Sequence, residues 1–429
     1  MSITALLYLM FIIFGLFKAL FSRPIWGIYV YFFTFYLHAP SSWWGKSLPD
    51  IRWSLIAASV TLIALFISSE HKPFKFWSYK SNLVIAIFCL LVVVQIPLAI
   101  NSVVHTEYVF LLVKFLLLIF IMQNSVKNID DLKGVVWINV IGASYLAYIG
   151  ISQFSGGRLE GLSTPGLGSA NQLSQHFGAI IIFVSYSLLG NLDTKNLLKI
   201  PFILLILYAL FLTESRGSIL GLGAILLLAL FFVPQHAKKK FYSFALLAAI
   251  AGSALMGPQI VERFASTQQN EMGEVKDASA RSRFAIIESQ WEMTKDSPII
   301  GHGHRGTLLL SPIYIEERYL TKQGVRASHN LLMAMLVDHG FLGAFLYFLT
   351  VYLCIKQIFV AKRQAIGANK AEVNELKSLL IGSCMALTYY IVVGMASNNK
   401  PLEADIWFIA LIPVIAMLIK NKTLESERN

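Results

Sequence analysis

The chain has 429 residues, of which 56% are hydrophobic and 14% are charged, and its mean hydropathy is +0.64. These values exclude an ordinary soluble protein and indicate an integral membrane protein. The formal net charge of +11 would suggest a nucleic-acid partner for a soluble chain. In a membrane protein, the side of the membrane that each charge occupies is more informative. We expect a lipid bilayer and no nucleic acid among the partners.

Apolar runs recur along almost the whole chain, and most are long enough to cross a hydrocarbon core of ~30 Å at about 1.5 Å per residue of α-helix. The sequence therefore predicts an all-α, polytopic integral membrane protein with 12–13 transmembrane helices. The number stays open because the second run is short and aromatic, and the first is compatible with a re-entrant segment. The first run lacks a basic start and a cleavage site, which favours a retained helix. The predicted spans lie near residues 3–21, 25–38, 53–69, 82–100, 106–123, 135–153, 172–190, 200–213, 218–233, 242–256, 329–355, 378–396 and 403–420.

The apolar runs divide the chain into three parts. Residues 1–256 hold spans one to ten, residues 257–328 form one large extracytoplasmic loop, and residues 329–429 hold the last three spans and a short cytoplasmic tail. Within the loop, "SRFAIIESQWEM" predicts an amphipathic helix that lies on the membrane surface or caps the bundle. Its predicted apolar face is Phe284, Ile286, Ile287 and Trp291, and its polar face is Glu288, Gln290 and Glu292. The three cysteines lie in apolar spans without paired spacing, so we expect them to be packing residues.

The basic residues set the orientation. Alternating the loops between the two sides gathers 20 of the 35 basic residues on one side, which is therefore cytoplasmic. Nine of the 12 arginines but only five of the 23 lysines lie on the other side, most of them in the long loop. A guanidinium binds phosphate or carboxylate through two parallel hydrogen bonds. The outer arginines are thus either anion ligands or members of surface ion pairs.

The stretch "SPIIGHGHRG", residues 297–306, has glycines spaced as in a dinucleotide-binding loop and two histidines that suggest metal ligands. The dinucleotide motif needs a buried strand before it, a helix after it and a cytoplasmic nucleotide supply, and we expect none of the three here. His302 and His304 have no cysteine or carboxylate partner at ligand spacing. We therefore expect no cofactor and no metal, and we interpret the stretch as a flexible glycine turn that returns the chain towards His329. Arg305 remains a candidate phosphate or sugar contact.

Three stretches of special composition lie where predicted spans emerge on the outer side: "GRLEGLSTPGLGSANQLSQH" from Gly157, "LTESRGSILGL" from Leu212 and "RASHNLLMAMLVDHGFLG" from Arg326. In the second, Arg216 lies at a helix start; in the third, Ser328 is a candidate N-cap that puts His329 in the first helical turn. Helix N-termini favour anions, which makes both places suitable for a diphosphate. An ordinary turn arginine and a solvated capping histidine remain the alternatives.

The order of these motifs, "GRLEG…N", "SRG", a long loop with "R…W…SPIIGHG", and "HN…DHGFLG", resembles the O-antigen ligase and polymerase superfamily of bacterial membrane glycosyltransferases. The resemblance is strongest from Gly157 to Gly343, and the loop is also similar to O-glycosylation ligases found beside exosortase systems. It implies transfer of a glycan from undecaprenyl diphosphate to an acceptor hydroxyl of lipid A core, protein or polysaccharide. The reaction would take place at the outer, periplasmic face of the bacterial inner membrane, without nucleotide sugar or metal. A polymerase of the same superfamily is the alternative, and a transporter of lipid-linked glycans is a less favoured one.

The resemblance also implies roles for single residues. Arg216 and Arg283 would hold the lipid diphosphate, with Arg281 as the alternative register, and His329 would accept the proton of the acceptor hydroxyl or position that hydroxyl. A histidine near its ordinary pKa of ~6.5 can do so at neutral pH. The family's Glu-x-Gly is here "DHG", with Asp338 in the acidic position, so no role carries over to that carboxylate.

Three further residues are candidates for substrate binding. Arg158 and Asn171 either line the same cavity or cap their loop. Lys114, in "FLLVKFLLLIF", is a cation within a predicted span, and such residues are costly in lipid unless paired. Lys114 would reach the phosphates, pair with a carboxylate, or extend its ammonium group to the membrane surface.

Overall fold

The computed structural model describes residues 2–68, 74–162, 164–233, 237–255, 278–364, 371–397 and 403–428. These residues form helices and connecting turns with no strand among them, which confirms the all-α class. The helices are α1 (Ile3–Phe21), α2 (Ile25–Tyr36), α3 (Trp53–Ile67), α4 (Lys80–Val94), α5 (Ser102–Ser125), α6 (Ile129–Ser152), α7 (Ala170–Gly190), α8 (Thr194–Leu197), α9 (Lys199–Leu212), α10 (Arg216–Phe232), α11 (Lys238–Leu255), α13 (Ala278–Asp296), α14 (Gly306–Tyr314), α15 (Leu331–Gln364), α16 (Ala371–Gly394) and α17 (Glu403–Arg428). Short 3-10 helices lie at Ala39–Ser41, Trp43–Ser47, Phe76–Ser78, Ile96–Leu98 and Glu317–Tyr319.

Every predicted span coincides with one of these helices, but not every helix has the length of a span. Seven helical segments of the described chain are long and apolar enough to cross a membrane, and α3, α4 and α10 are apolar but shorter. The 12 residues of α2 cover only about 18 Å along the helix axis. The multi-pass organisation is therefore clear, whereas the number of 12–13 spans stays a prediction.

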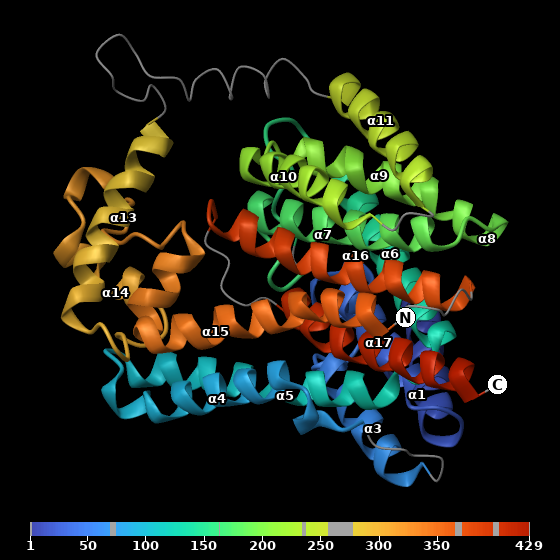
Figure 1. Cartoon of the computed structure of the whole chain (residues 1–429). Coiled ribbons are helices and arrows are strands. Elements are labelled where there is room, and N and C mark those ends of the chain that lie inside the picture. Colours follow the sequence, from blue (N-terminus) through green and yellow to red (C-terminus); the bar gives the residue numbers. More distant parts are fainter. Residues whose placement is uncertain are drawn as a thin grey trace.

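Helices α7 and α16 form the centre of the bundle. They are the most buried of the apolar helices, whereas most of α1 is exposed at the outside (Figure 1). The two helices approach closely because each offers a glycine to a tyrosine of the other. A Cβ at Gly178 would lie 2.2 Å from the Tyr389 hydroxyl, and a Cβ at Gly382 would lie 2.6 Å from Cβ of Tyr186. Small residues at helix contacts are typical of membrane bundles.

Hydrogen bonds and ion pairs join the connections between helices at two ends of the bundle. At one end, Ile100 N–H donates to the His302 carbonyl, and Leu159 N–H donates to the Leu212 carbonyl. We call this the loop end, because α13 and α14 lie there, away from both chain termini (Figure 1). The opposite end is joined by ion pairs between distant segments, which are Arg23–Asp131, Lys133–Glu375 and Lys422–Glu372.

The described part of the long loop, residues 278–328, is folded onto the start of α15. Its small core consists of Ile286, Met293, Ile315 and Val337. The expected amphipathic helix is present within α13, with Ile286 buried and Glu288 and Glu292 exposed as predicted, but Gln290 does not lie on the polar face. Gln290 is fully buried and donates to Oγ1 of Thr307 at 3.0 Å, whereas Phe284 and Trp291 are exposed. The buried face of α13 packs against α14 and α15.

Helix α15 is broken at Gly340, whose φ of 64° and ψ of −172° are not helical. The "SPIIGHGHRG" stretch lies against this break, where His302 N–H and Gly303 N–H donate to the carbonyls of Val337 and Asp338. Beyond the break, Phe341 N–H donates to the Pro298 carbonyl. The stretch is thus an ordered junction that satisfies the backbone of a broken helix, and the interpretation as a flexible turn is wrong.

Candidate functional site

Arg216 is the first residue of α10 and is half-buried at the loop end. The turn before it contains Glu214 in a left-handed conformation with φ of 49°, which is unusual for a residue with a side chain. Such a turn needs support from its surroundings. The support comes from the loop that precedes α7.

Arg158 and Asn171 hold this turn. The Arg158 guanidinium donates from Nε to the Thr213 carbonyl at 3.0 Å and from a terminal nitrogen to Oδ1 of Asn171 at 2.9 Å. The same Asn171 oxygen accepts a hydrogen bond from Oγ of Ser215 at 3.1 Å. The structure therefore brings Arg158 and Asn171 next to Arg216, in positions that fix the backbone around it.

His329 lies just before α15, which begins at Leu331, and not in the first helical turn as expected. The cap is Asn330, because its Oδ1 accepts a hydrogen bond from Met333 N–H at 3.0 Å. Ser328, the expected cap, instead accepts a hydrogen bond from Asn330 N–H and donates one to the Asn330 carbonyl. His329 thus lies in a short non-helical segment before α15. Its two neighbours in the chain, Ser328 and the cap Asn330, are hydrogen-bonded to each other.

Two arginines lie close enough to His329 to act on its charge. Burial lowers the pKa of His329 to about 4, and the positive charges of Arg326 and Arg283 contribute to the decrease. The imidazole is therefore neutral at pH 7, with a lower pKa than the ordinary value assumed from the sequence. The structure thus places Arg283, on α13, near His329, in the segment before α15.

Arg216 lies near His329 because the residues next to each of them contact the segment that follows α16. A Cβ at Gly217 would lie 3.3 Å from Cβ of Ala396, and Nδ2 of Asn330 donates to the carbonyl of Met395 at 3.0 Å. Consecutive residues after α16 thus contact the neighbour of Arg216 on one side and the neighbour of His329 on the other. We define the candidate site as His329, Arg283, Arg326 and Arg216.

Arg326 was missed as a site residue from the sequence. It precedes His329 by three residues in "RASHN", which was the available signal. Its backbone N–H donates to Oγ of Ser311 at 2.8 Å, and its Nε is buried without a hydrogen-bond partner among the described residues. A buried guanidinium nitrogen of this kind suits an anion that the protein itself does not supply.

Asp338 has a structural role. Its two carboxylate oxygens accept hydrogen bonds from Arg305 N–H at 3.0 Å and Gly306 N–H at 2.9 Å, which caps the N-terminus of α14. Arg305 is left-handed, with φ of 63°, and its side chain is exposed. A helix does follow the glycines, contrary to the expectation, but its N-terminus is occupied by a protein carboxylate.

The two histidines of the same stretch bond to protein groups. Nε2 of His302 lies 2.7 Å from the Met293 carbonyl, and the His304 ring stacks on Tyr108 with centroids 3.9 Å apart. Within the described residues no three His, Cys, Asp or Glu side chains gather as metal ligands. Metal-free chemistry remains a prediction.

Lys114 is not brought to the site. Lys114 is exposed on the outside of α5, 12 residues beyond its first residue Ser102, among exposed apolar side chains such as Phe110 and Val113. That position is about 18 Å along the helix from the loop end. The side chain of Arg281 lies outside the described residues.

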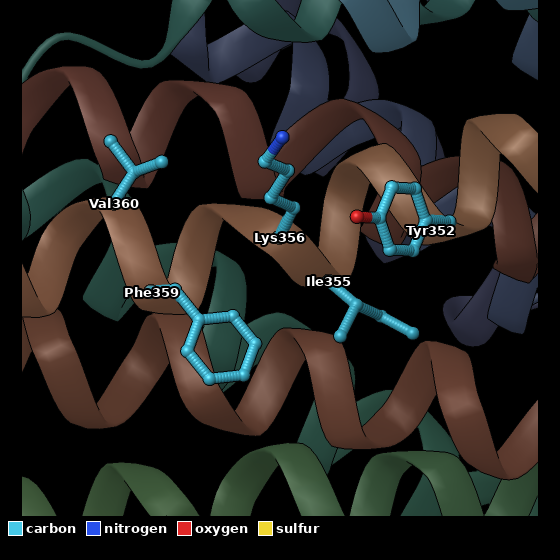
Figure 2. A pocket seen from close by; sticks show the side chains of 5 residues that line it. All are labelled: Tyr352, Ile355, Lys356, Phe359 and Val360. Atoms are coloured by element: carbon cyan, nitrogen blue, oxygen red, sulfur yellow. The ribbon is translucent and has the colours of Figure 1, made fainter.

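One groove of about 270 Å³ lies elsewhere, on α15 beyond its break. Figure 2 shows its lining side chains, which are Tyr352, Ile355, Lys356, Phe359 and Val360. Its only ionisable groups are the Lys356 ammonium and the Tyr352 hydroxyl. No residue of the candidate site lines this groove, so its position does not bear on the site.

The fold and the site together define a multi-pass helical membrane protein with a neutral histidine between arginines at one end of the bundle. Residues 201–348 match the family model for O-antigen ligase. The match runs from α9 into α15 and contains Arg216, Arg283, Arg326 and His329, whereas Arg158 and Asn171 precede it. The predicted resemblance to the O-antigen ligase superfamily is thereby confirmed for this part of the chain, and an enzyme acting as a glycan ligase or polymerase is supported. No curated protein was found to match the chain.

Proposed function

We propose that this protein transfers a glycan from undecaprenyl diphosphate to an acceptor hydroxyl at the periplasmic face of the bacterial inner membrane. The observation that carries the proposal is the neutral His329 beside Arg283 and Arg326, within a region that matches O-antigen ligase. Fixed guanidinium groups suit a diphosphate, and a neutral imidazole suits a hydroxyl. The acceptor is a hydroxyl of lipid A core, protein or polysaccharide.

In the proposed reaction, the bond between the sugar's anomeric carbon and the diphosphate breaks, and a bond from that carbon to the acceptor oxygen forms. Negative charge develops on the departing diphosphate oxygen, where Arg216, Arg283 and Arg326 would stabilise it without a metal. The acceptor's proton passes to His329, and undecaprenyl diphosphate leaves. Arg158 and Asn171 would act as positioning residues for Arg216 and not as ligands.

The bound diphosphate also changes the basicity of His329. In the free protein, burial and two positive charges hold its pKa near 4, which makes it a weak base. A diphosphate beside Arg283 and Arg326 would offset their charges and raise the pKa of His329. The histidine would thus become a better base only when the donor is present.

The proposed orientation rests on the distribution of charge. The end opposite α13 and α14 carries lysines near the starts of helices, which are Lys133 in α6, Lys195 in α8 and Lys199 in α9. The positive-inside rule favours the cytoplasm for that end. The loop end, with the candidate site, would then face the periplasm.

The test is an assay of the purified full-length protein in proteoliposomes with a lipid-linked glycan and an acceptor glycan. His329→Ala should lower the transfer rate by about 10²–10⁴-fold, because it removes the base. Arg283→Lys keeps the charge but loses two-pronged phosphate binding and should cost about tenfold or more. Arg318→Lys is the matched control, since Arg318 is an exposed arginine of the same loop paired with Glu316 at 2.8 Å. Unchanged transfer in His329→Ala at normal protein level would exclude the assigned site.

The product distinguishes the two enzyme types within the superfamily. A ligase moves a finished glycan to a different acceptor, and its deletion leaves full-length lipid-linked polymer. A polymerase joins lipid-linked repeat units, and its deletion leaves single units. Movement of the lipid-linked glycan across the bilayer without a new glycosidic bond would instead support a transporter.

A further inference from the structure

Helix α13 has three faces, and only one is used to pack the protein. Its buried face consists of Ser282, Ile286, Gln290 and Met293. At 100° per residue, a second face carries the exposed charged residues Glu288, Glu292, Lys295 and Asp296, in which Lys295 pairs with Glu292 at 2.7 Å. Between the two lie Phe284 and Trp291, which are separated by two helical turns and are 68% and 45% exposed.

The exposed aromatic residues of α13 continue onto α15. The Trp291 and Phe341 rings are in edge-to-face contact, with centroids 6.3 Å apart. Phe341 and, one turn later, Phe345 are also exposed, on the part of α15 that follows the Gly340 break. We call these four residues, Phe284, Trp291, Phe341 and Phe345, the aromatic strip. The strip therefore runs from the loop helix α13 to the membrane-spanning helix α15.

The direction of α13 fits this arrangement. It runs across the direction of α4, α5 and α15 at the loop end of the bundle (Figure 1). A helix that lies across the spanning helices lies along the membrane surface. An exposed aromatic strip next to a separate charged face is a feature of an interfacial helix.

We propose that α13 is inserted in the outer surface of the lipid bilayer, with the aromatic strip in contact with lipid chains and the charged face in water. The occupant of the strip is the bilayer because Phe345 lies on the lipid-exposed side of a spanning helix, and Trp291 contacts its neighbour Phe341. An exposed aromatic surface of this kind is costly in water and stable in the membrane interface. The contact does not depend on the proposed glycan transfer.

One consequence concerns Arg283, which adjoins Phe284 in the chain. On the helix it lies between the buried face and the aromatic strip. Insertion of the strip would hold Arg283 at the boundary between lipid chains and headgroups. Under the proposed function, that is the depth at which the diphosphate of a lipid-linked donor lies.

The test is spin labelling of single cysteines on α13 in the full-length protein in lipid nanodiscs. Phe284→Cys and Trp291→Cys report on the strip, and Glu288→Cys and Glu292→Cys are matched controls on the charged face of the same helix. Power saturation compares accessibility to oxygen, which concentrates in lipid, with that to a water-soluble nickel chelate. Labelling of the unmutated protein corrects for its own cysteines, which are buried.

We expect labels at positions 284 and 291 to be accessible to oxygen and protected from nickel, and labels at 288 and 292 to show the reverse. Nickel accessibility at all four positions would overturn the proposal, because α13 would then lie in water. Protection from both reagents at 284 would also overturn it, since protein, such as a second copy of the chain, would cover the strip. Phe284 is mostly exposed, so its substitution decides the matter even if Trp291→Cys fails to fold. No readout involves activity, so a failed glycan assay and a failed insertion test are distinguishable.

Discussion

Two segments at the loop end hold the candidate site, and they are supported in different ways. The α9–α10 turn with Arg216 is held by side chains from a nearby surface loop, mainly Arg158 and Asn171. The junction from α13 to α15, which carries Arg283 and His329, is held by backbone pairing around Gly340. It is also held by Gln95, whose amide donates to the Ile300 and Asp338 carbonyls.

Both segments contain a left-handed residue with a side chain, Glu214 in the turn and Arg305 in the junction. The neighbouring backbone is held by a charged side chain in each, through the Thr213 carbonyl in one and Arg305 N–H in the other. Arg158 is half-buried, whereas Asp338 is 1% exposed. Lost hydrogen bonds cost more where water cannot replace them. The difference predicts that damage to the junction lowers stability, whereas damage to the turn lowers activity first.

The largest effect is expected from Gly340→Ala. A Cβ there would lie 2.3 Å from the Ile299 carbonyl oxygen in a backbone conformation that favours glycine. We expect a loss of about 3 kcal/mol or more in the free energy of unfolding, measured as a lower thermal midpoint in detergent. Gly324→Ala is the control, because Gly324 is also left-handed but has open space around it. Equal effects of the two substitutions would show that close packing at the break is unimportant.

Asp338→Ala should have the next largest effect. It leaves the N–H groups of Arg305 and Gly306 without their acceptor at a buried helix start, which should cost about 2–5 kcal/mol. Proteolysis of the loop together with thermal unfolding would measure it. Asp338→Asn retains one acceptor oxygen and should fall in between. A stable Asp338→Ala protein that loses only activity would instead indicate a direct role in the reaction.

Arg158→Ala should leave stability nearly unchanged, with a loss of about 1 kcal/mol, because water can reach the freed partners. Transfer activity should fall by about tenfold or more, since the turn that orients Arg216 is less well fixed. Arg158→Lys should not restore activity, because one ammonium group cannot bond both Thr213 and Asn171 in the same geometry. Normal turnover in Arg158→Ala would show that the α9–α10 turn keeps its conformation without Arg158.

The pH profile is the most sensitive comparison with the sequence-based expectation. His329 is neutral above its pKa of about 4 in the free protein. The acid side of the kcat/KM profile, which reports on the free enzyme, should therefore fall only as the pH drops towards 4. A fall centred near the ordinary value of ~6.5 would mean that neither burial nor the charges of Arg326 and Arg283 lower the pKa of His329 in the working protein. The Arg326→Gln variant should move this limb upward.

Much of the fold follows from the sequence. Every predicted span coincides with a helix, because apolar length and the cost of burying polar backbone favour a helix at each of these places. On α13, the sequence placed Gln290 on the polar face, because periodicity assigns the faces of a helix by hydrophobicity alone. Gln290 is buried instead because Thr307 provides a hydrogen-bond partner, and no periodicity reveals such a partner.

Hydropathy and motif order are local properties of the chain, and they predict an all-helical membrane protein, a resemblance to O-antigen ligase and the candidates Arg216, Arg283 and His329. Three further findings come from the folded chain: Arg158 and Asn171 support Arg216, Arg326 joins His329, and Lys114 lies apart. The tertiary structure also turned "SPIIGHGHRG" from an expected flexible turn into the ordered partner of a broken helix. These outcomes depend on contacts between residues far apart in the chain, such as Gly301 against Gly340, and on the burial that those contacts create.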